Sequence, residues 1–304
     1  MDKIRVAILG AGTVGTGVYK LINKQADEMI HKVGANIEIA KILVRNKNKT
    51  RDGIDSAYLT DNFDDILNDD SINIVVEVMG GIEPANTYIT QALKAKKNIV
   101  TANKDLIASK GHALMELAKE NGCDLLFEAA VAGAIPIIRP LKQCLAGNYI
   151  SEIMGIVNGT TNFILTKMTK EGMDFDEALK IAQDLGYAEA DPTGDIEGYD
   201  AARKMAIMAS IAFNTRVTFD DVATEGITKI TTEDFKYAEK IGCVVKLLAT
   251  SKKINDKVYA ITAPFLIEKE HPLYNVNDVL NGIYIKGNVI GDVMFFGAGA
   301  GKLP

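Results

Sequence analysis

A glycine-rich stretch near the start of the chain constrains the fold more than any other feature. A short apolar run, "IRVAIL" (4–9), leads into Gly10-Ala11-Gly12-Thr13-Val14-Gly15. The segment that follows, "TGVYKLINKQADEMI" (16–30), has apolar residues at helical spacing, which predicts one helix. A GxGxxG pattern between a strand and a helix is typical of dinucleotide-binding folds. The sequence therefore predicts a nucleotide site at this loop.

Each glycine of the loop has its own physical reason. Gly10 permits a tight turn, Gly12 lets the backbone approach a pyrophosphate, and Gly15 lets the helix pack closely on the strand. The phosphate would then meet the positive end of the helix, at Thr13 and Val14. The alternative is a tight turn that binds no ligand.

Strands and helices alternate through the first half of the chain. After "IEIAKILVR" (37–45), further strands are predicted at 72–78, 98–103 and 124–130, with helical patterns at 84–97 and 109–122 between them. This alternation favours a doubly wound, Rossmann-type α/β domain whose parallel sheet is covered on both faces.

The pattern changes after about residue 134. A half-buried strand (149–159), two helices (173–186 and 199–213) and two strands around an Asn255-Asp256 turn indicate an α+β domain with a mostly antiparallel sheet. We expect an NAD(P)-binding domain at 1–133, to which 292–304 return, and a substrate-binding and dimerisation domain at 134–291.

Composition excludes several classes of protein. The chain has 304 residues, 47% of them hydrophobic, and a net charge of −6, which favours neither nucleic acid nor an anionic membrane as a partner. No stretch is long and apolar enough for a membrane helix, and no secretory signal is recognisable. Three separate cysteines, Cys123, Cys144 and Cys243, fit a reducing compartment, so we expect a cytoplasmic protein without a zinc site.

The carboxyl ends of the parallel strands indicate where ligands bind. Arg45, Gly80, Thr101, Lys104 and Glu128 fall at this edge of the sheet. The second strand ends without the acid that holds the ribose 2′-OH of NAD, and Arg45 stands near its place. This favours NADP over NAD, while a basic solvated loop remains the alternative. Lys104 opens a helix, an unfavourable place for a cation, so a function there is expected.

A second constellation lies in "AEADPTGDIEGYDAARK" (188–204), which contains five carboxylates. Asp200 and Lys204 are spaced i,i+4 and share a helix face. Because the residues around them are apolar, we expect the pair to be partly enclosed, which favours proton transfer over a plain surface salt bridge. The plain salt bridge remains the alternative.

Several segments together resemble the successive motifs of the homoserine dehydrogenase family. They are "GAGTVGTGVYKLI", "TANKDLIA", "EAAVAGAIPIIRPL", "GIVNGTTNFILTKM", "AEADPTGDIEGYDAARKMAIMA", "EGI" and "GAGAG", in this order over the whole chain. The resemblance implies NAD(P)-dependent interconversion of L-aspartate 4-semialdehyde and L-homoserine, on the route to threonine and methionine.

The resemblance also implies residue roles. Asp200 and Lys204 match the catalytic pair, and Lys104 matches a lysine near the substrate. Glu189 and Asp195 match the substrate-binding acids. A monovalent cation, usually sodium, is bound in the family by residues that match Glu128, Val131, Gly133 and Ile135, and Gly301 matches a glycine that contacts the nucleotide.

The resemblance further implies a homodimer built by the second domain. The chain stops at "GKLP", before a helix that in the family returns to the nucleotide domain and before the ACT-type regulatory domain of many members. We therefore expect a truncated short form, which leaves full activity and feedback control open. Two other functions remain open: another NADP-linked semialdehyde dehydrogenase, and a non-catalytic nucleotide-binding regulator.

Overall fold

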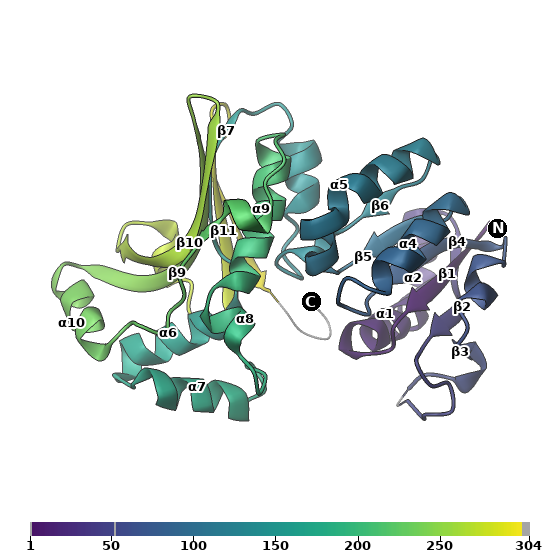
Figure 1. Cartoon of the computed structure of the whole chain (residues 1–304), viewed down its shortest axis with the longest axis horizontal. Coiled ribbons are helices and arrows are strands. Elements are labelled where there is room, and N and C mark those ends of the chain that lie inside the picture. Colours follow the sequence, from purple (N-terminus) through teal and green to yellow (C-terminus); the bar gives the residue numbers. More distant parts are fainter. Residues whose placement is uncertain (1, 52, 300–304) are drawn as a thin grey trace. The chain divides into compact units, whose positions relative to one another are not determined.

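The computed structural model describes residues 2–51 and 53–299, which form two compact units. The division falls between Ala130 and Val131, close to the predicted boundary. Each unit contains a six-stranded sheet with helices around it (Figure 1).

The first unit is a parallel sheet in the order β3-β2-β1-β4-β5-β6. This is the strand order of the Rossmann fold, so the predicted doubly wound domain is confirmed. Its elements are β1 (Lys3–Leu9), α1 (Thr13–Lys24), α2 (Ala26–Val33), β2 (Asn36–Leu43), η1 (Ser56–Tyr58), β3 (Leu59–Thr60), α3 (Asp64–Leu67), β4 (Ile72–Glu77), α4 (Ala85–Lys94), β5 (Asn98–Thr101), α5 (Lys104–Glu120), β6 (Leu125–Leu126) and η2 (Glu128–Ala130).

Two local predictions in this unit need correction. The single helix expected over 16–30 is broken at Gln25, whose backbone leaves the helical region and whose N–H closes α1 on the Leu21 carbonyl. The strand expected over 124–130 is only two residues long, because the chain turns into η2 at Glu128.

The second unit is a mixed sheet in the order β12-β11-β7-β9-β10-β8, antiparallel except between β10 and β8. Its elements are η3 (Pro140–Cys144, a π-helical turn), β7 (Ile150–Ile156), α6 (Gly159–Glu171), α7 (Phe175–Asp184), α8 (Thr193–Ile196), α9 (Tyr199–Ala212), η4 (Phe219–Asp221), β8 (Ala223–Thr224), α10 (Thr232–Lys240), β9 (Cys243–Ile254), β10 (Lys257–Glu268), η5 (Pro272–Asn275), β11 (Leu280–Gly287) and β12 (Gly291–Ala298).

Strands β9 and β10, of 12 residues each, form a long hairpin in this unit (Figure 1). Asn255 and Asp256 both have positive φ, which is what a two-residue hairpin turn requires and what their residue types predict. Helix α9 packs along β9, β10 and β7, and its buried side chains, from Ala201 to Ala209, explain why its sequence is so apolar.

The end of the chain corrects the predicted domain map. Residues 292–298 were expected to return to the nucleotide domain, but they lie in β12 and pair with β11 in the second sheet. The β-branched and aromatic residues of "GDVMFFGA" form this hairpin strand. Gly301 lies outside the described residues.

Candidate functional site

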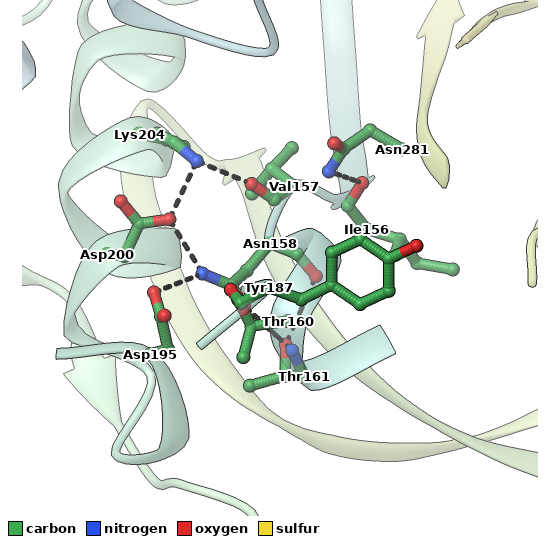
Figure 2. A network of polar contacts seen from close by, with 10 residues as sticks. All are labelled: Ile156, Val157, Asn158, Thr160, Thr161, Tyr187, Asp195, Asp200, Lys204 and Asn281. Atoms are coloured by element: carbon green, nitrogen blue, oxygen red, sulfur yellow. Dashed lines mark hydrogen bonds and ion pairs between the residues drawn. The ribbon is translucent and has the colours of Figure 1, made fainter. Parts of the chain in front are cut away.

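A buried ion pair lies at the start of α9 (Figure 2). Lys204 Nζ donates to Asp200 Oδ2 at 2.6 Å and to the Val157 carbonyl oxygen at 2.7 Å. The two side chains are only 14% and 8% exposed, so the predicted enclosure is confirmed. An ammonium has three N–H groups, and among the described residues only two of them find an acceptor. One N–H of Lys204 is therefore available to a ligand oxygen.

Asn158 joins the two acids of the cluster. Its amide nitrogen donates to Asp195 Oδ1 at 2.7 Å and to Asp200 Oδ2 at 2.9 Å (Figure 2). Asp200 Oδ2 thus accepts from both Asn158 and Lys204. The sequence interpretation quoted the "GIVNGTTNF" segment but gave Asn158 no role.

The local fold fixes Asn158. The residue follows β7 and is the N-cap of α6, where its side-chain oxygen accepts from the Thr161 N–H at 2.9 Å. An N-cap holds one rotamer, because its oxygen must face the first helical turn. The amide nitrogen is thereby aimed at the acids of α8 and α9. An Asn before a helical pattern is the signal that was available in the sequence.

Burial and charge act together on Asp195. Removal from water raises the pKa of its carboxyl, and the neighbouring negative charge of Asp200 raises it further, while the hydrogen bond from Asn158 works in the opposite direction. A carboxylate that is costly to ionise alone favours a cationic ligand, because a positive charge would offset the cost.

Glu189, the other predicted substrate-binding acid, shares no hydrogen bond with this cluster in the described structure. The residue is exposed between α7 and α8, and its backbone carbonyl accepts from the Gln183 side chain at 3.2 Å. In the described part of the chain its carboxylate forms no hydrogen bond or ion pair.

The glycine loop of the first unit has the geometry that its motif predicts. Gly10 has a φ of +107°, and a Cβ at Gly15 would lie 2.1 Å from the Gly10 carbonyl oxygen, so neither tolerates a side chain. A Cβ at Gly12 would meet nothing within 4 Å. No side chain caps α1 at Gly12, and the first N–H groups of a helix, here those of Thr13 and Val14, have no partner within it, which suits an anion.

An exposed cation follows the end of β2, beside this loop. The Leu43 carbonyl accepts from Gly10 N at 3.0 Å, which ties the loop to β2. Arg45 follows two residues later, is exposed, and pairs with no acid among the described residues. Lys47, by contrast, is paired with Asp61 at 3.0 Å.

The other predicted nucleotide residues lie at the carboxyl ends of β4 and β5. Gly80 is exposed in the turn after β4, Thr101 is the last residue of β5 and is buried, and Lys104 is the first residue of α5. Asn103 caps α5 by accepting from the Leu106 N–H at 3.1 Å. The edge of the sheet predicted to hold the cofactor is thus built as expected.

The predicted cation segment has an unusual backbone. Ala132 and Gly133 both have positive φ, 56° and 46°, so the chain reverses between Val131 and Ile135. Within this turn the Ile135 N–H donates to the Ala132 carbonyl oxygen at 2.9 Å. Backbone carbonyl oxygens are suitable ligands for a hard monovalent cation. Among the described residues, no group of three or more His, Cys, Asp or Glu side chains is arranged so that it could hold a metal ion.

Comparison with known proteins decides the family. A family model described as the homoserine dehydrogenase NAD-binding domain matches residues 10–128, and the homoserine dehydrogenase model matches 136–304. The homoserine dehydrogenase of Bacillus subtilis is 47% identical over the whole chain, which covers 70% of that protein. The chain belongs to the homoserine dehydrogenase family. Its members are NAD(P)-dependent oxidoreductases, and the sequence interpretation of the family is confirmed.

Solved homoserine dehydrogenases have the same fold. The enzyme from Thiobacillus denitrificans superposes with a TM-score of 0.96 at 42% identity, over 100% of this chain and 70% of that one. The Staphylococcus aureus enzyme gives 0.88 at 48% identity, over 100% and 76% of the two chains. A hyperthermophilic archaeal homoserine dehydrogenase solved with NADPH gives 0.83 at 28% identity, over 99% and 93%. Within the described residues no helix is long and apolar enough to cross a membrane.

Proposed function

We propose that this chain interconverts L-aspartate 4-semialdehyde and L-homoserine, with Lys204 as the group that moves the proton. The observation that carries the proposal is the enclosed Lys204 ammonium, held by Asp200 and the Val157 carbonyl with one N–H to spare. When bound, the nicotinamide exchanges hydride with C4 of the substrate. The γ-oxygen at that carbon then needs a proton donor in one direction and an acceptor in the other, and a positioned lysine supplies both.

The acids of the cluster suit the other end of the substrate. Homoserine carries an α-ammonium group, and Asp195 is a half-buried carboxylate whose pKa is raised by its burial and by the neighbouring charge of Asp200. Binding an ammonium there offsets the cost of its ionisation. Glu189, with an unengaged carboxylate, is proposed as a second partner of the same ammonium.

For the cofactor we propose NADP, with NAD as the alternative. Gly10, Gly12 and Gly15 would hold the pyrophosphate at α1, and Arg45 would pair with the 2′-phosphate, because among the described residues no acid is paired with it. We also propose a monovalent cation, sodium by preference, at Glu128 and the carbonyls of Val131, Gly133 and Ile135. Gly301 remains a proposed nucleotide contact.

We further propose that the chain works as a cytoplasmic homodimer in the pathway to threonine and methionine. The support for the dimer is a set of exposed apolar side chains on the second sheet: Tyr259 and Ile261 on β10 are 56% and 38% exposed, and Phe296 on β12 is 55% exposed. A solvent-facing surface of this kind favours a protein partner.

The decisive experiment compares two lysines. Lys204→Ala should lower kcat by about 10² or more, the usual contribution of a positioned acid–base group, and should leave the NADPH Kd unchanged. Lys104→Ala is measured beside it, because Lys104 is the rival proton carrier. The variant that removes the titration from the pH profile of kcat/KM identifies the carrier. Lys167→Ala, which breaks the exposed Lys167–Glu171 pair of α6, is the control.

The same assay separates the remaining alternatives. Oxidation of NADPH that depends on aspartate semialdehyde supports the proposed substrate, whereas activity with another semialdehyde alone would indicate a different dehydrogenase. A regulator would bind NADPH without turnover. If neither lysine variant changes the pH profile, the assignment of the proton to a lysine is wrong.

A further inference from the structure

Glu77, the last residue of β4, is a fully buried carboxylate with 0% exposure. Its Oε1 accepts from the Met79 N–H at 2.8 Å, and its Oε2 accepts from the Thr101 hydroxyl at 2.7 Å. In the described regions of the chain it forms no ion pair. A buried acid without a cationic partner is costly unless its oxygens are hydrogen-bonded, and both oxygens of Glu77 accept a hydrogen bond.

The hydrogen bonds continue from Thr101 to the start of α5. The Thr101 hydroxyl oxygen accepts from the Asn103 N–H at 3.0 Å, and the Asn103 amide nitrogen donates to the Gly81 carbonyl at 2.6 Å. The Asn103 side-chain oxygen caps α5. These bonds form a closed ring from Glu77 through β5 and α5 back to the turn after β4.

The ring fixes two pieces of backbone that the proposed function uses. One is the Met79–Gly81 turn, in which Gly80 and Gly81 have positive φ. Because glycine has little conformational preference of its own, such a turn needs other contacts to hold it. The other is the first turn of α5, which begins at Lys104. Both lie at the carboxyl edge of the parallel sheet, where dinucleotides bind.

We propose that Glu77 is a positioning residue for the nicotinamide cofactor and for Lys104. It acts through Thr101 and Asn103, by holding the Met79–Gly81 turn and the start of α5 in one arrangement. The inference rests on the proposed function and deepens it. It assigns to Glu77, which itself would touch no ligand, the task of holding the carboxyl edge of the parallel sheet in the arrangement that binds the cofactor.

Two near-isosteric substitutions test the ring. Glu77→Gln exchanges one acceptor oxygen for a donor, so either the Met79 N–H or the Thr101 hydroxyl loses its acceptor. Thr101→Val removes the hydroxyl and leaves Glu77 Oε2 and the Asn103 N–H unpaired. Each should raise the Kd for NADPH at least about tenfold, because Glu77→Gln orphans one buried group and Thr101→Val orphans two, and each should lower kcat at saturating cofactor. Because both break the same ring, the double variant should be less impaired than the product of the two effects.

A matched pair of residues serves as the control. Glu83 accepts from the Thr87 hydroxyl at 2.8 Å in the same unit, but this Glu–Thr pair is exposed at the start of α4. Glu83→Gln and Thr87→Val should leave the NADPH Kd and kcat within twofold of the parent chain, the scatter expected for a surface hydrogen bond of about 0.4 kcal/mol or less. Thr101→Ser, which restores the hydroxyl, should recover the affinity lost in Thr101→Val.

NADPH affinity, kcat and melting temperature together decide the outcome. A lowered melting temperature with unchanged Kd and kcat would reduce Glu77 to a purely structural role and overturn the inference. If Glu77→Gln fails to fold, Thr101→Val and its serine rescue carry the same test. If the parent chain itself binds no NADPH, the proposed function fails instead, so the two failures are distinguishable.

Discussion

The charge of Asp195, next to that of Asp200, works against the stability of the folded protein. The two carboxylates share the amide nitrogen of Asn158, and only Asp200 has a lysine as a direct partner. Burial and the charge of Asp200 raise the pKa of Asp195, so the folded protein holds this proton more tightly than the unfolded chain does. At neutral pH the ionised Asp195 therefore costs stability until a cation arrives.

Asp195→Asn should stabilise the ligand-free protein. Asparagine keeps the acceptor for Asn158 and removes the charge, so we expect a melting temperature about 1–3 °C higher near pH 7.5. The sign follows from linkage: the cost is absent below the ordinary aspartate pKa and appears as pH rises through the raised, folded-state pKa. The gain should therefore shrink as the pH is lowered towards acid. The KM for the amino-acid substrate should rise.

Asp191→Asn is the matched control for this prediction. Asp191 lies on the same segment, but hydrogen bonds from Thr193 lower the pKa of its carboxyl. Removing its charge should lower the melting temperature slightly or leave it unchanged. Equal stabilisation by both variants, measured by thermal scans across the pH range, would contradict a specific cost at Asp195.

At the scale of elements, the sequence predicts what local spacing determines. Asp200 and Lys204 are one helical turn apart, so their contact follows from the prediction of a helix. Asn158 contacts Asp200 across 42 positions of sequence, and Thr101 contacts Glu77 across 24. Such contacts depend on how β7, α6 and α9, or β4 and β5, pack in three dimensions, and periodicity carries no information on that.

The pairing of the strands was the other feature that the sequence could predict only in part. The alternation of strands and helices was sufficient to predict the parallel sheet, because each crossover is local. The hairpin of β11 and β12 was missed, and 292–298 were placed in the wrong domain. Periodicity cannot show which sheet receives a terminal strand. The break at Gln25 was missed because apolar residues continue at helical spacing on both sides of it.

The glycine loop gives a prediction at this scale, because its positions require glycine for different physical reasons. A side chain at Gly12 meets open space, and its backbone angles, φ −80° and ψ −159°, suit any residue. Gly12→Val should therefore fold with an unchanged melting temperature but lose NADPH binding, because the side chain occupies the path of the pyrophosphate. Gly15→Ala should instead lower the melting temperature, because its Cβ meets the Gly10 carbonyl.

Titration of both variants with NADPH, beside thermal scans, checks this division. Gly122→Ala, at a helix end with positive φ and nothing near its Cβ, is the control for substitution of a glycine as such. Unchanged NADPH affinity in Gly12→Val would contradict the proposed nucleotide site.

At the scale of the whole molecule, one face of the second sheet carries exposed apolar side chains near its two edges, Tyr259 and Ile261 on β10 and Phe296 on β12, while Thr250 and Tyr284 between them are buried. Cross-strand neighbours form a row across it: Ile261, Thr250, Met154, Tyr284 and Met294. The next row is Tyr259, Lys252, Glu152, Lys286 and Asp292, in which four charged side chains alternate in sign. The alternation neutralises the row internally, so a second copy could lie against this face without like-charge repulsion.

The proposed dimer predicts the effect of a charge at Ile261, in the first of these two rows. Ile261 is exposed on this face, while its neighbour Thr262 points the other way and is fully buried. Ile261→Asp should turn a dimer at micromolar concentration into a monomer, because an interface would have to bury an unpaired carboxylate. Ile241→Asp is the control, since Ile241 is 65% exposed at the end of α10 and lies outside the sheet. Sedimentation velocity of the three chains measures the result, and a monomeric parent chain, or equal dissociation of both variants, would contradict an interface on this face.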